Sequence, residues 1–339
     1  MDIDGPWLLI SLLVALPATF LLGWLASRID LRQWRRVDRQ APKAYFKGLN
    51  LLLNEQTDKA IDAFIEAVQH DPDTSELHFA LGNLFRRRGE FERAVRVHQH
   101  LLQRADLSAG DRERAQHALA QDFMKAGLFD RAEAAFRALD GTPFETEARL
   151  ALLSLAERSR DWGAAVDVAS MLEKAGAASF ATRIAHYRCE QALEAEQRGD
   201  AQAASAMLVQ AQAVAPQAAR PLVQRAQQLA RMGELNAAMA VWAELGQRDP
   251  ASFVRLAGEY VDCALAAGRV DAATQTLAPL FALQPGIDLL HALAKLDSGG
   301  AMPRLMDLLR EQPSLSAAIE LLDTPRQTWP ESARQSACL

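Results

Sequence analysis

The apolar and polar positions divide the chain sharply near residue 26. Residues 7–26 carry no charged side chain and are mostly apolar. Twenty helical residues at about 1.5 Å each span the roughly 30 Å hydrocarbon core of a bilayer, so this run predicts a transmembrane helix. Residues 1–6 contain neither Lys nor Arg. A cleaved signal peptide would carry basic residues there, which favours an uncleaved anchor.

The charges that flank this predicted helix give it a direction. Residues 27–41 form a basic juxtamembrane segment, whereas residues 1–6 include two acids. By the positive-inside rule, we expect the rest of the chain in the cytoplasm and residues 1–6 as a short periplasmic N-terminus. Indole rings and arginines favour the headgroup region, and the residues predicted at that interface are Trp7, Trp24, Arg28, Arg32, Arg35 and Arg36.

From residue 42 onward the small and apolar positions recur with a period of 34 residues. Gly48 and Gly82 are separated by 34 positions, as are Ala60 and Ala94. Later segments repeat the same order of a small residue, a glycine, a second small residue and a proline. This pattern predicts an array of about seven helix pairs over residues 42–311, with a degenerate fourth pair and a shortened last one. Residues 312–339 are expected to form a helix remnant and a disordered tail.

Each recurring position has a physical role. Small residues in both helices of a pair allow a close approach, and the glycine between them suits a left-handed helix end. The proline stops the second helix. The glycines expected in the turns are Gly89, Gly127, Gly199, Gly233 and Gly268.

This combination of positions is that of the tetratricopeptide repeat. The predicted fold is therefore all-α, with an N-terminal transmembrane helix followed by a tetratricopeptide-repeat α-solenoid. Another α-solenoid of similar period is the alternative fold.

Composition narrows the partners and the compartment. A net charge of −6 argues against nucleic acid as a partner, because phosphate-binding surfaces are usually basic. Cys189, Cys263 and Cys338 lie far apart without C-x-x-C spacing, which favours a reducing compartment over a disulfide framework.

The sequence contains no pattern that predicts catalysis, and no enzyme activity is expected. His98 and His100 are two residues apart and face different sides of a helix. His186 and Cys189 share a helix face, but two ligands do not make a zinc site. We therefore predict no cofactor and no metal.

What remains is a surface for protein partners. In a tetratricopeptide stack the first helices of successive repeats line a concave groove. Cations and amides on that groove could hold an extended or acidic peptide, while the alternative is an ordinary solvated basic face. The predicted groove residues are Phe79, Asn83, Arg86, Arg87, Arg114, His117, Gln121 and Lys125.

Three stretches of the repeats carry a family resemblance. They are G-L-N-L-L-L-N-E-Q-T-D-K-A-I-D-A-F at 48–64, L-G-N-L-F-R-R-R-G-E-F-E-R-A-V-R-V-H-Q at 81–99 and A-G-L-F-D-R-A-E at 126–133. With the N-terminal anchor, they resemble the lipopolysaccharide assembly protein B family over roughly residues 1–310.

That resemblance implies a function for the chain. It implies an adaptor in the bacterial inner membrane that regulates lipopolysaccharide synthesis. Its implied partners are the FtsH protease, the LpxC deacetylase that FtsH degrades, an inner-membrane lipopolysaccharide sensor and membrane lipids. A generic membrane-tethered scaffold for protein-complex assembly is the alternative that the repeats alone would support.

The chain departs from this family at its C-terminal end. The family carries a rubredoxin-like zinc module with two C-x-x-C knuckles, whereas only Cys338 follows Cys263 here. Because four thiolates are needed, the zinc of that module is not expected in this chain.

Overall fold

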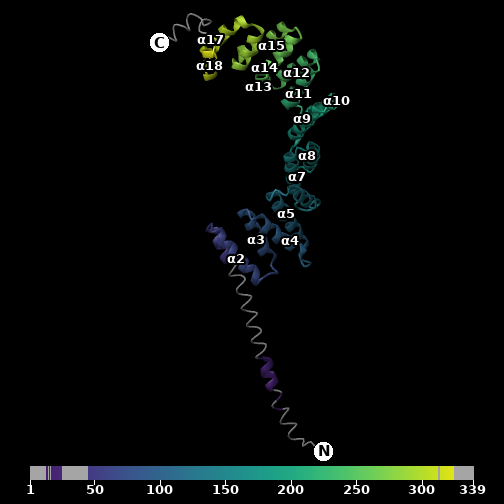
Figure 1. The fold of residues 1–339 in the computed structure, drawn as a ribbon, viewed down its shortest axis with the longest axis vertical. Coiled ribbons are helices and arrows are strands. Elements are labelled where there is room, and N and C mark those ends of the chain that lie inside the picture. The colour runs from purple at the N-terminus through teal and green to yellow at the C-terminus, as the bar shows by residue number, and fades with distance from the viewer. Residues whose placement is uncertain (1–12, 14, 16, 25–44, 312–313, 324–339) are drawn as a thin grey trace, which may run out of the picture. The chain divides into compact units, whose positions relative to one another are not determined.

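The computed structural model describes residues 13, 15, 17–24, 45–311 and 314–323, and no strand occurs within these ranges (Figure 1). The all-α prediction is confirmed for them. The residues group into two compact bodies, Met1–Leu155 and Ala156–Leu339.

Helices of the N-terminal body follow one another in antiparallel-style pairs joined by short turns. α3 and α4 lie side by side, and so do α4 and α5 (Figure 1). The described helices of this body are residues 45–53, α2 (Thr57–His70), α3 (Ser75–Arg88), α4 (Phe91–Gln103), α5 (Ala109–Lys125), α6 (Phe129–Arg137) and α7 (Glu145–Ser159), the last of which continues into the second body.

The C-terminal body repeats the same alternation. Its closest helix pairs are α9 with α10 and α11 with α12. Its described helices are α8 (Trp162–Lys174), α9 (Ala181–Gln197), α10 (Ala201–Val214), α11 (Ala219–Arg231), α12 (Leu235–Arg248), α13 (Pro250–Arg255), α14 (Ala257–Ala266), α15 (Val270–Leu283), α16 (Ile287–Leu296), the 3-10 turn η1 (Ser298–Gly300), α17 (Ala301–Glu311) and α18 (Leu315–Asp323).

A left-handed residue separates the two helices of each of the first seven pairs, from residues 45–53 with α2 to α14 with α15. The predicted turn glycines all have positive φ, from 66° at Gly268 to 85° at Gly89. Beyond Gly89, the Glu90 N–H donates to the Phe85 carbonyl at 2.8 Å, which satisfies a carbonyl at the end of α3. The degenerate fourth repeat has Arg160 in the glycine's place with φ 57°, and the first repeat has Glu55 there. The strained conformation is retained where the glycine is missing.

The small residues of the second helices form the buried line of contact between helices. All of them are 0% exposed: Ala60, Ala94, Ala132, Ala165, Ala204, Ala238 and Ala273. Four positions further along each helix lies a second buried residue, which fills the space beside it: Phe64, His98, Phe136, Ala169, Leu208, Trp242 and Leu277.

Two glycines of the first helices face that second buried position directly. A Cβ on Gly48 would lie 2.7 Å from a ring carbon of Phe64, and one on Gly82 would lie 2.5 Å from the ring of His98. Only a residue without a side chain fits at that separation, so the predicted close approach is confirmed. The contact between the glycine and the ring also explains why both of its members recur after 34 residues, from Gly48 to Gly82 and from Phe64 to His98.

Half of the predicted membrane span lies outside the described residues. Residues 27–41 of the basic segment and residues 324–339 lie outside them entirely. Among the residues that the structure describes, no helix combines the length and the apolar character that crossing a bilayer requires. Trp24, one of the predicted interface residues, is 47% exposed.

Replacing Gly82 with Ala should destabilise the protein by about 1–3 kcal/mol, because the new methyl group overlaps the His98 ring and the helices must separate. The midpoint of urea unfolding measures the effect. Gly110, in the first turn of α5, is the matched control: its Cβ would meet nothing within 4 Å, so Gly110→Ala should be neutral or slightly stabilising. Equal midpoints for both variants would contradict the close approach.

Candidate partner-binding face

The first helices of successive repeats contact one another, and α3 and α5 form the part of this surface where the groove was predicted. We call it the first-helix face. The structure brings the predicted groove residues onto these two helices, but it gives them very different surroundings.

On this face, the side chain of Arg114 covers the ring of Phe79. The Arg114 guanidinium makes two hydrogen bonds to the Glu76 carboxylate, at 2.5 and 3.2 Å, and lies 4.1 Å from the centre of the Phe79 ring. Phe79 is only 1% exposed. It is therefore a core residue, covered by its neighbours, and is not accessible to a partner as the groove prediction supposed.

Arg86 is bound inside a polar network that joins three helices. Its Nη1 donates to Asp122 Oδ1 at 2.8 Å and to the Ala118 carbonyl at 3.0 Å, and its Nη2 donates to Asn83 Oδ1 at 2.6 Å. His98 Nδ1 lies 2.5 Å from the other oxygen of Asp122 and donates to it. Arg86 and Asn83 are thus partners within the fold before any ligand arrives.

The centre of this network is fully buried. Asp122 and His98 are both 0% exposed. An unpaired carboxylate there would be very costly, and the arginine and the imidazole together compensate for it. His98 occupies the position that Phe64 and Phe136 fill in the neighbouring repeats. From the sequence, His98 was predicted only to face a different side of its helix from His100. The signal that could have found its role is this single polar residue at a repeat position that is otherwise apolar.

His117 is neutral near pH 7 rather than one of the groove's cations. Its ring stacks on Phe144 with centres 4.7 Å apart, and the Gln121 amide lies 3.3 Å from its Nε2. Burial lowers the pKa of His117 and the nearby Arg86 adds to the effect, while Glu147 opposes it. His117 and Gln121 therefore offer this face hydrogen-bonding groups without charge.

Arg87 and Lys125 are the exposed cations of the predicted set. Among the described residues neither has an ion-pair or hydrogen-bond partner, and both side chains are exposed. They occupy equivalent positions, each five residues after the small residue of its first helix, Gly82 and Ala120. The first-helix face thus presents two unengaged cations, one repeat apart.

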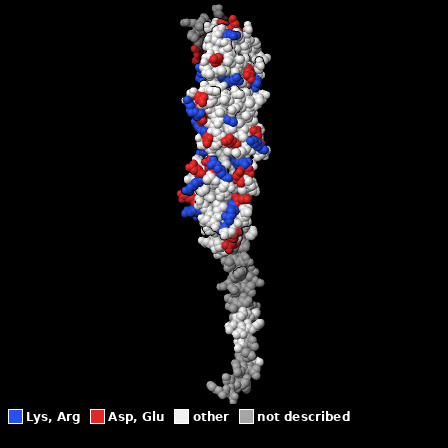
Figure 2. Space-filling model, turned by 90° about the vertical axis from the view of Figure 1, so that its right-hand side faces the viewer, with Lys and Arg blue, Asp and Glu red and all other residues white. Residues whose placement is uncertain are grey.

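The C-terminal body pairs its first helices in the same way. Arg220 on α11 binds Glu190 on α9 at 2.5 Å, and Lys295 on α16 binds Asp262 on α14 at 2.6 Å. Arg231 is 2.7 Å from Glu196. Ion pairs between successive first helices are therefore a general feature of both bodies. On the side that Figure 2 views, basic and acidic side chains are interspersed instead of segregated by sign.

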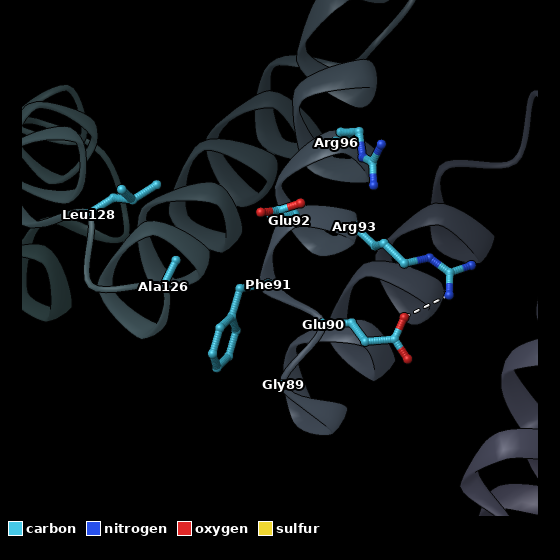
Figure 3. A pocket seen from close by; sticks show the side chains of 8 residues that line it. All are labelled: Gly89, Glu90, Phe91, Glu92, Arg93, Arg96, Ala126 and Leu128. Atoms are coloured by element: carbon cyan, nitrogen blue, oxygen red, sulfur yellow. Dashed lines mark hydrogen bonds and ion pairs between the residues drawn. The ribbon is translucent and has the colours of Figure 1, made fainter.

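A second surface feature lies at the turns of two neighbouring repeats. It is a depression of about 570 Å³, whose wall includes the Glu90–Arg93 ion pair at 2.6 Å (Figure 3). Its lining combines two acids, two arginines and apolar groups: Gly89, Glu90, Phe91, Glu92, Arg93, Arg96, Ala126 and Leu128. Because the two acids and the two arginines balance, the lining of this depression has no net charge with which to select a charged ligand.

Metal-ligating and nucleophilic groups give no other site among the residues that the structure describes. Within the described ranges no three His, Cys, Asp or Glu side chains come close enough to hold a metal ion. Cys189 is buried, and burial raises the pKa of its thiol to about 11. Its helix neighbour His186 instead contacts Arg220, and burial lowers the pKa of His186. The two residues share Arg220 as a neighbour but differ in burial, because the His186 side chain is 51% exposed.

The helix pairs, their left-handed turns and the surface of paired first helices define a class of protein. Residues 47–106 and 117–180 match the tetratricopeptide repeat family model, so the chain contains tetratricopeptide repeats. A tetratricopeptide repeat protein from Parabacteroides merdae is 15% identical with a TM-score of 0.38, and the match covers 76% of this chain and 99% of that one.

Within that class, the chain is homologous to lipopolysaccharide assembly protein B. It is 40% identical to this protein of Escherichia coli strain K12 over 185 residues, which cover 54% of this chain and 48% of the relative. The protein of the same name from Haemophilus influenzae is 34% identical over 197 residues, covering 55% and 50%. The matched part of the chain spans about half the length of these curated relatives. The family resemblance is confirmed over that part.

Asp122→Ala should lower the free energy of unfolding by about 3–5 kcal/mol, because it removes the carboxylate that compensates Arg86 and His98. Urea unfolding followed by circular dichroism measures the change. Asp130, an exposed acid of α6, is the matched control, and Asp130→Ala should stay within about 0.5 kcal/mol of the wild type. Equal losses from the two substitutions would show that the network contributes nothing.

Cys189 and Cys263 should resist alkylation by iodoacetamide at pH 8 in the folded protein. Both are buried, and burial raises the pKa of both thiols, so little thiolate is present or accessible. Mass spectrometry of the alkylated peptides measures this. The same treatment in urea is the control, where both should react fully. Rapid modification of either residue in the folded state would contradict its burial.

Proposed function

We propose that this chain is a non-enzymatic adaptor of lipopolysaccharide assembly that acts at the bacterial inner membrane. The observation that carries the proposal is the 40% identity to lipopolysaccharide assembly protein B over 185 residues. The tetratricopeptide matches at residues 47–106 and 117–180 support the adaptor role, because such arrays present extended surfaces to other proteins.

In this proposal the chain promotes proteolysis of the LpxC deacetylase by the FtsH protease. An inner-membrane lipopolysaccharide sensor restrains it. These partners come from the family resemblance, and the homology over about half the chain supports carrying them over. The chain supplies no chemistry itself and instead brings substrate and protease together, which raises the effective concentration of one beside the other.

The proposed setting is a single-pass anchor at residues 7–26, with the N-terminus in the periplasm and the repeats in the cytoplasm. The uncharged run and the basic segment 27–41 support this arrangement. Trp7, Trp24 and the arginines that follow would hold the anchor at the headgroups. An anchored adaptor meets membrane-bound partners in two dimensions, where encounter is more frequent.

The proposed partner-binding residues are Arg87 and Lys125, assisted by the neutral groups of His117 and Gln121. The two cations are exposed and unengaged within the described part of the chain, and they lie on adjacent first helices. Their charge suits an acidic segment of a partner, held by charge-assisted hydrogen bonds. Arg86 and Arg114 take no direct part, because Asp122 and Glu76 already hold them.

The double substitution Arg87→Glu/Lys125→Glu should weaken partner binding by roughly tenfold for each charge reversed and should raise LpxC abundance towards the level seen without the chain. Immunoblotting of LpxC in cells that carry the variant in place of the wild type measures this. Lys59→Glu/Arg96→Glu is the matched control, since both residues are exposed on second helices, and it should leave LpxC unchanged.

Two results would contradict different parts of the proposal. A constant LpxC level when the chain is removed would exclude the lipopolysaccharide role and leave a generic membrane-tethered scaffold. The other result is an LpxC level that is normal in cells with the Arg87→Glu/Lys125→Glu variant and altered in cells without the chain. It would support the function and exclude this face as its binding surface.

A further inference from the structure

The first described helix of the array, residues 45–53, is apolar on two opposite sides. It contains no acid, and Lys47 is its single charged residue. A helix that is apolar all round is normally covered all round, whereas a surface helix has one polar side. The helix thus has the composition of a helix inside the array, although it is the first described helix of the array.

One of its sides is covered by α2. Tyr45, Leu49 and Leu52 pack against the core cluster that contains Phe64, and the Tyr45 ring meets the Phe64 ring edge-on at 6.0 Å. Gly48 lies directly against Phe64. This side makes the same contact that the first helices of later repeats make with their own second helices.

The opposite side is uncovered. Phe46 is 65% exposed and Leu53 is 85% exposed. At about 100° per residue these two positions, seven apart, lie on one side of the helix, roughly opposite Gly48. Terminal repeats of such arrays usually present a polar outer surface, which keeps them soluble. Two large apolar side chains in that place require something to cover them.

The sequence next to this side indicates what the cover is. Three residues separate the helix from the basic segment 27–41, which itself follows the uncharged run 7–26. Lys47 is 63% exposed, and its Nζ lies 3.6 Å from a carboxylate oxygen of Glu66 on α2, so it belongs to an exposed ion pair within the array. Exposed apolar residues beside a stretch of arginines are the combination that binds at the boundary of headgroups and acyl chains.

We infer that the side of helix 45–53 that carries Phe46 and Leu53 lies on the surface of a lipid bilayer with anionic headgroups. The inference rests on the proposed membrane anchor and goes beyond it, because it makes the first repeat itself a membrane contact. The two apolar side chains enter the interface. The array would then be fixed against the membrane by two contacts, which restricts its orientation.

Spin labels on the full chain test this. Phe46→Cys and Leu53→Cys are each labelled in a Cys338→Ser background, in which the remaining thiols Cys189 and Cys263 are buried. Val209→Cys on α10 is the matched control, because Val209 is a 51% exposed apolar residue in the other body. Each labelled chain is reconstituted into vesicles of phosphatidylcholine and phosphatidylglycerol, and flotation confirms that the chain is bound.

The accessibility of each label to oxygen and to a nickel chelate measures its immersion. The labels at positions 46 and 53 should be accessible to oxygen and protected from nickel, and the label at 209 should show the reverse. Three labels equally open to nickel on a chain that floats would overturn the inference and leave the anchor intact. Dipolar broadening between copies would also overturn it, since a second copy would then cover the helix. A chain that fails to float would overturn both the anchor and this contact.

Discussion

Close packing of the two helices within each repeat is the constraint on which this structure depends. The helices approach so closely because one side of the contact carries almost no side chain. Gly48 accommodates the ring of Phe64, and Gly82 accommodates the ring of His98. The buried alanines of the second helices complete the contact from the other side. This geometry sets which residues of a first helix face inward and which reach solvent, and so it determines what a partner can meet.

The second repeat meets this constraint with a polar ring. His98 fills the position of Phe64, but it also donates to Asp122 on α5, which in turn accepts from Arg86 on α3. One carboxylate therefore joins three helices of two repeats. A buried ionic network is seldom more stabilising than apolar packing of the same shape. The network instead determines the orientation of a helix, because hydrogen bonds to both oxygens of Asp122 fix the rotation of α5 relative to α3 and α4. Arg87 lies on α3 and Lys125 on α5, two of the helices that this network joins.

Repetition made much of this fold predictable from the sequence. The turn glycines, the buried alanines and the helix ends before Pro72 and Pro216 follow from backbone conformation and steric limits, which act locally. The left-handed turn survives even at Arg160, where the sequence offers no glycine, because the packing of the flanking helices imposes it. A local pattern could suggest a degenerate fourth repeat, but the conformation of Arg160 depends on tertiary contacts.

The binding face was harder to predict because its character depends on the neighbouring repeat. Helical spacing places Phe79 and Arg86 on the correct helix and does not reveal what covers them. The guanidinium of Arg114 covers the Phe79 ring, and Arg86 forms an ion pair with Asp122, which lies 36 residues away in the sequence. The acid partners were present in the sequence, and Glu76 even holds the position in its repeat that Arg114 holds in the next. Only contacts between repeats show that these charges meet.

The pairing of charges along the first helices also governs how this surface can bind. Exposed ion pairs such as Arg114–Glu76 contribute little to stability, and salt screens them. Their larger effect is to cancel the local field, so that acidic partners are not attracted to the whole face. In the proposed binding mode, binding strength would come from the few cations that remain unengaged, and each of them would add only a modest amount. Such a surface would discriminate between partners by the positions of a few charges and would release them readily, which suits the proposed adaptor.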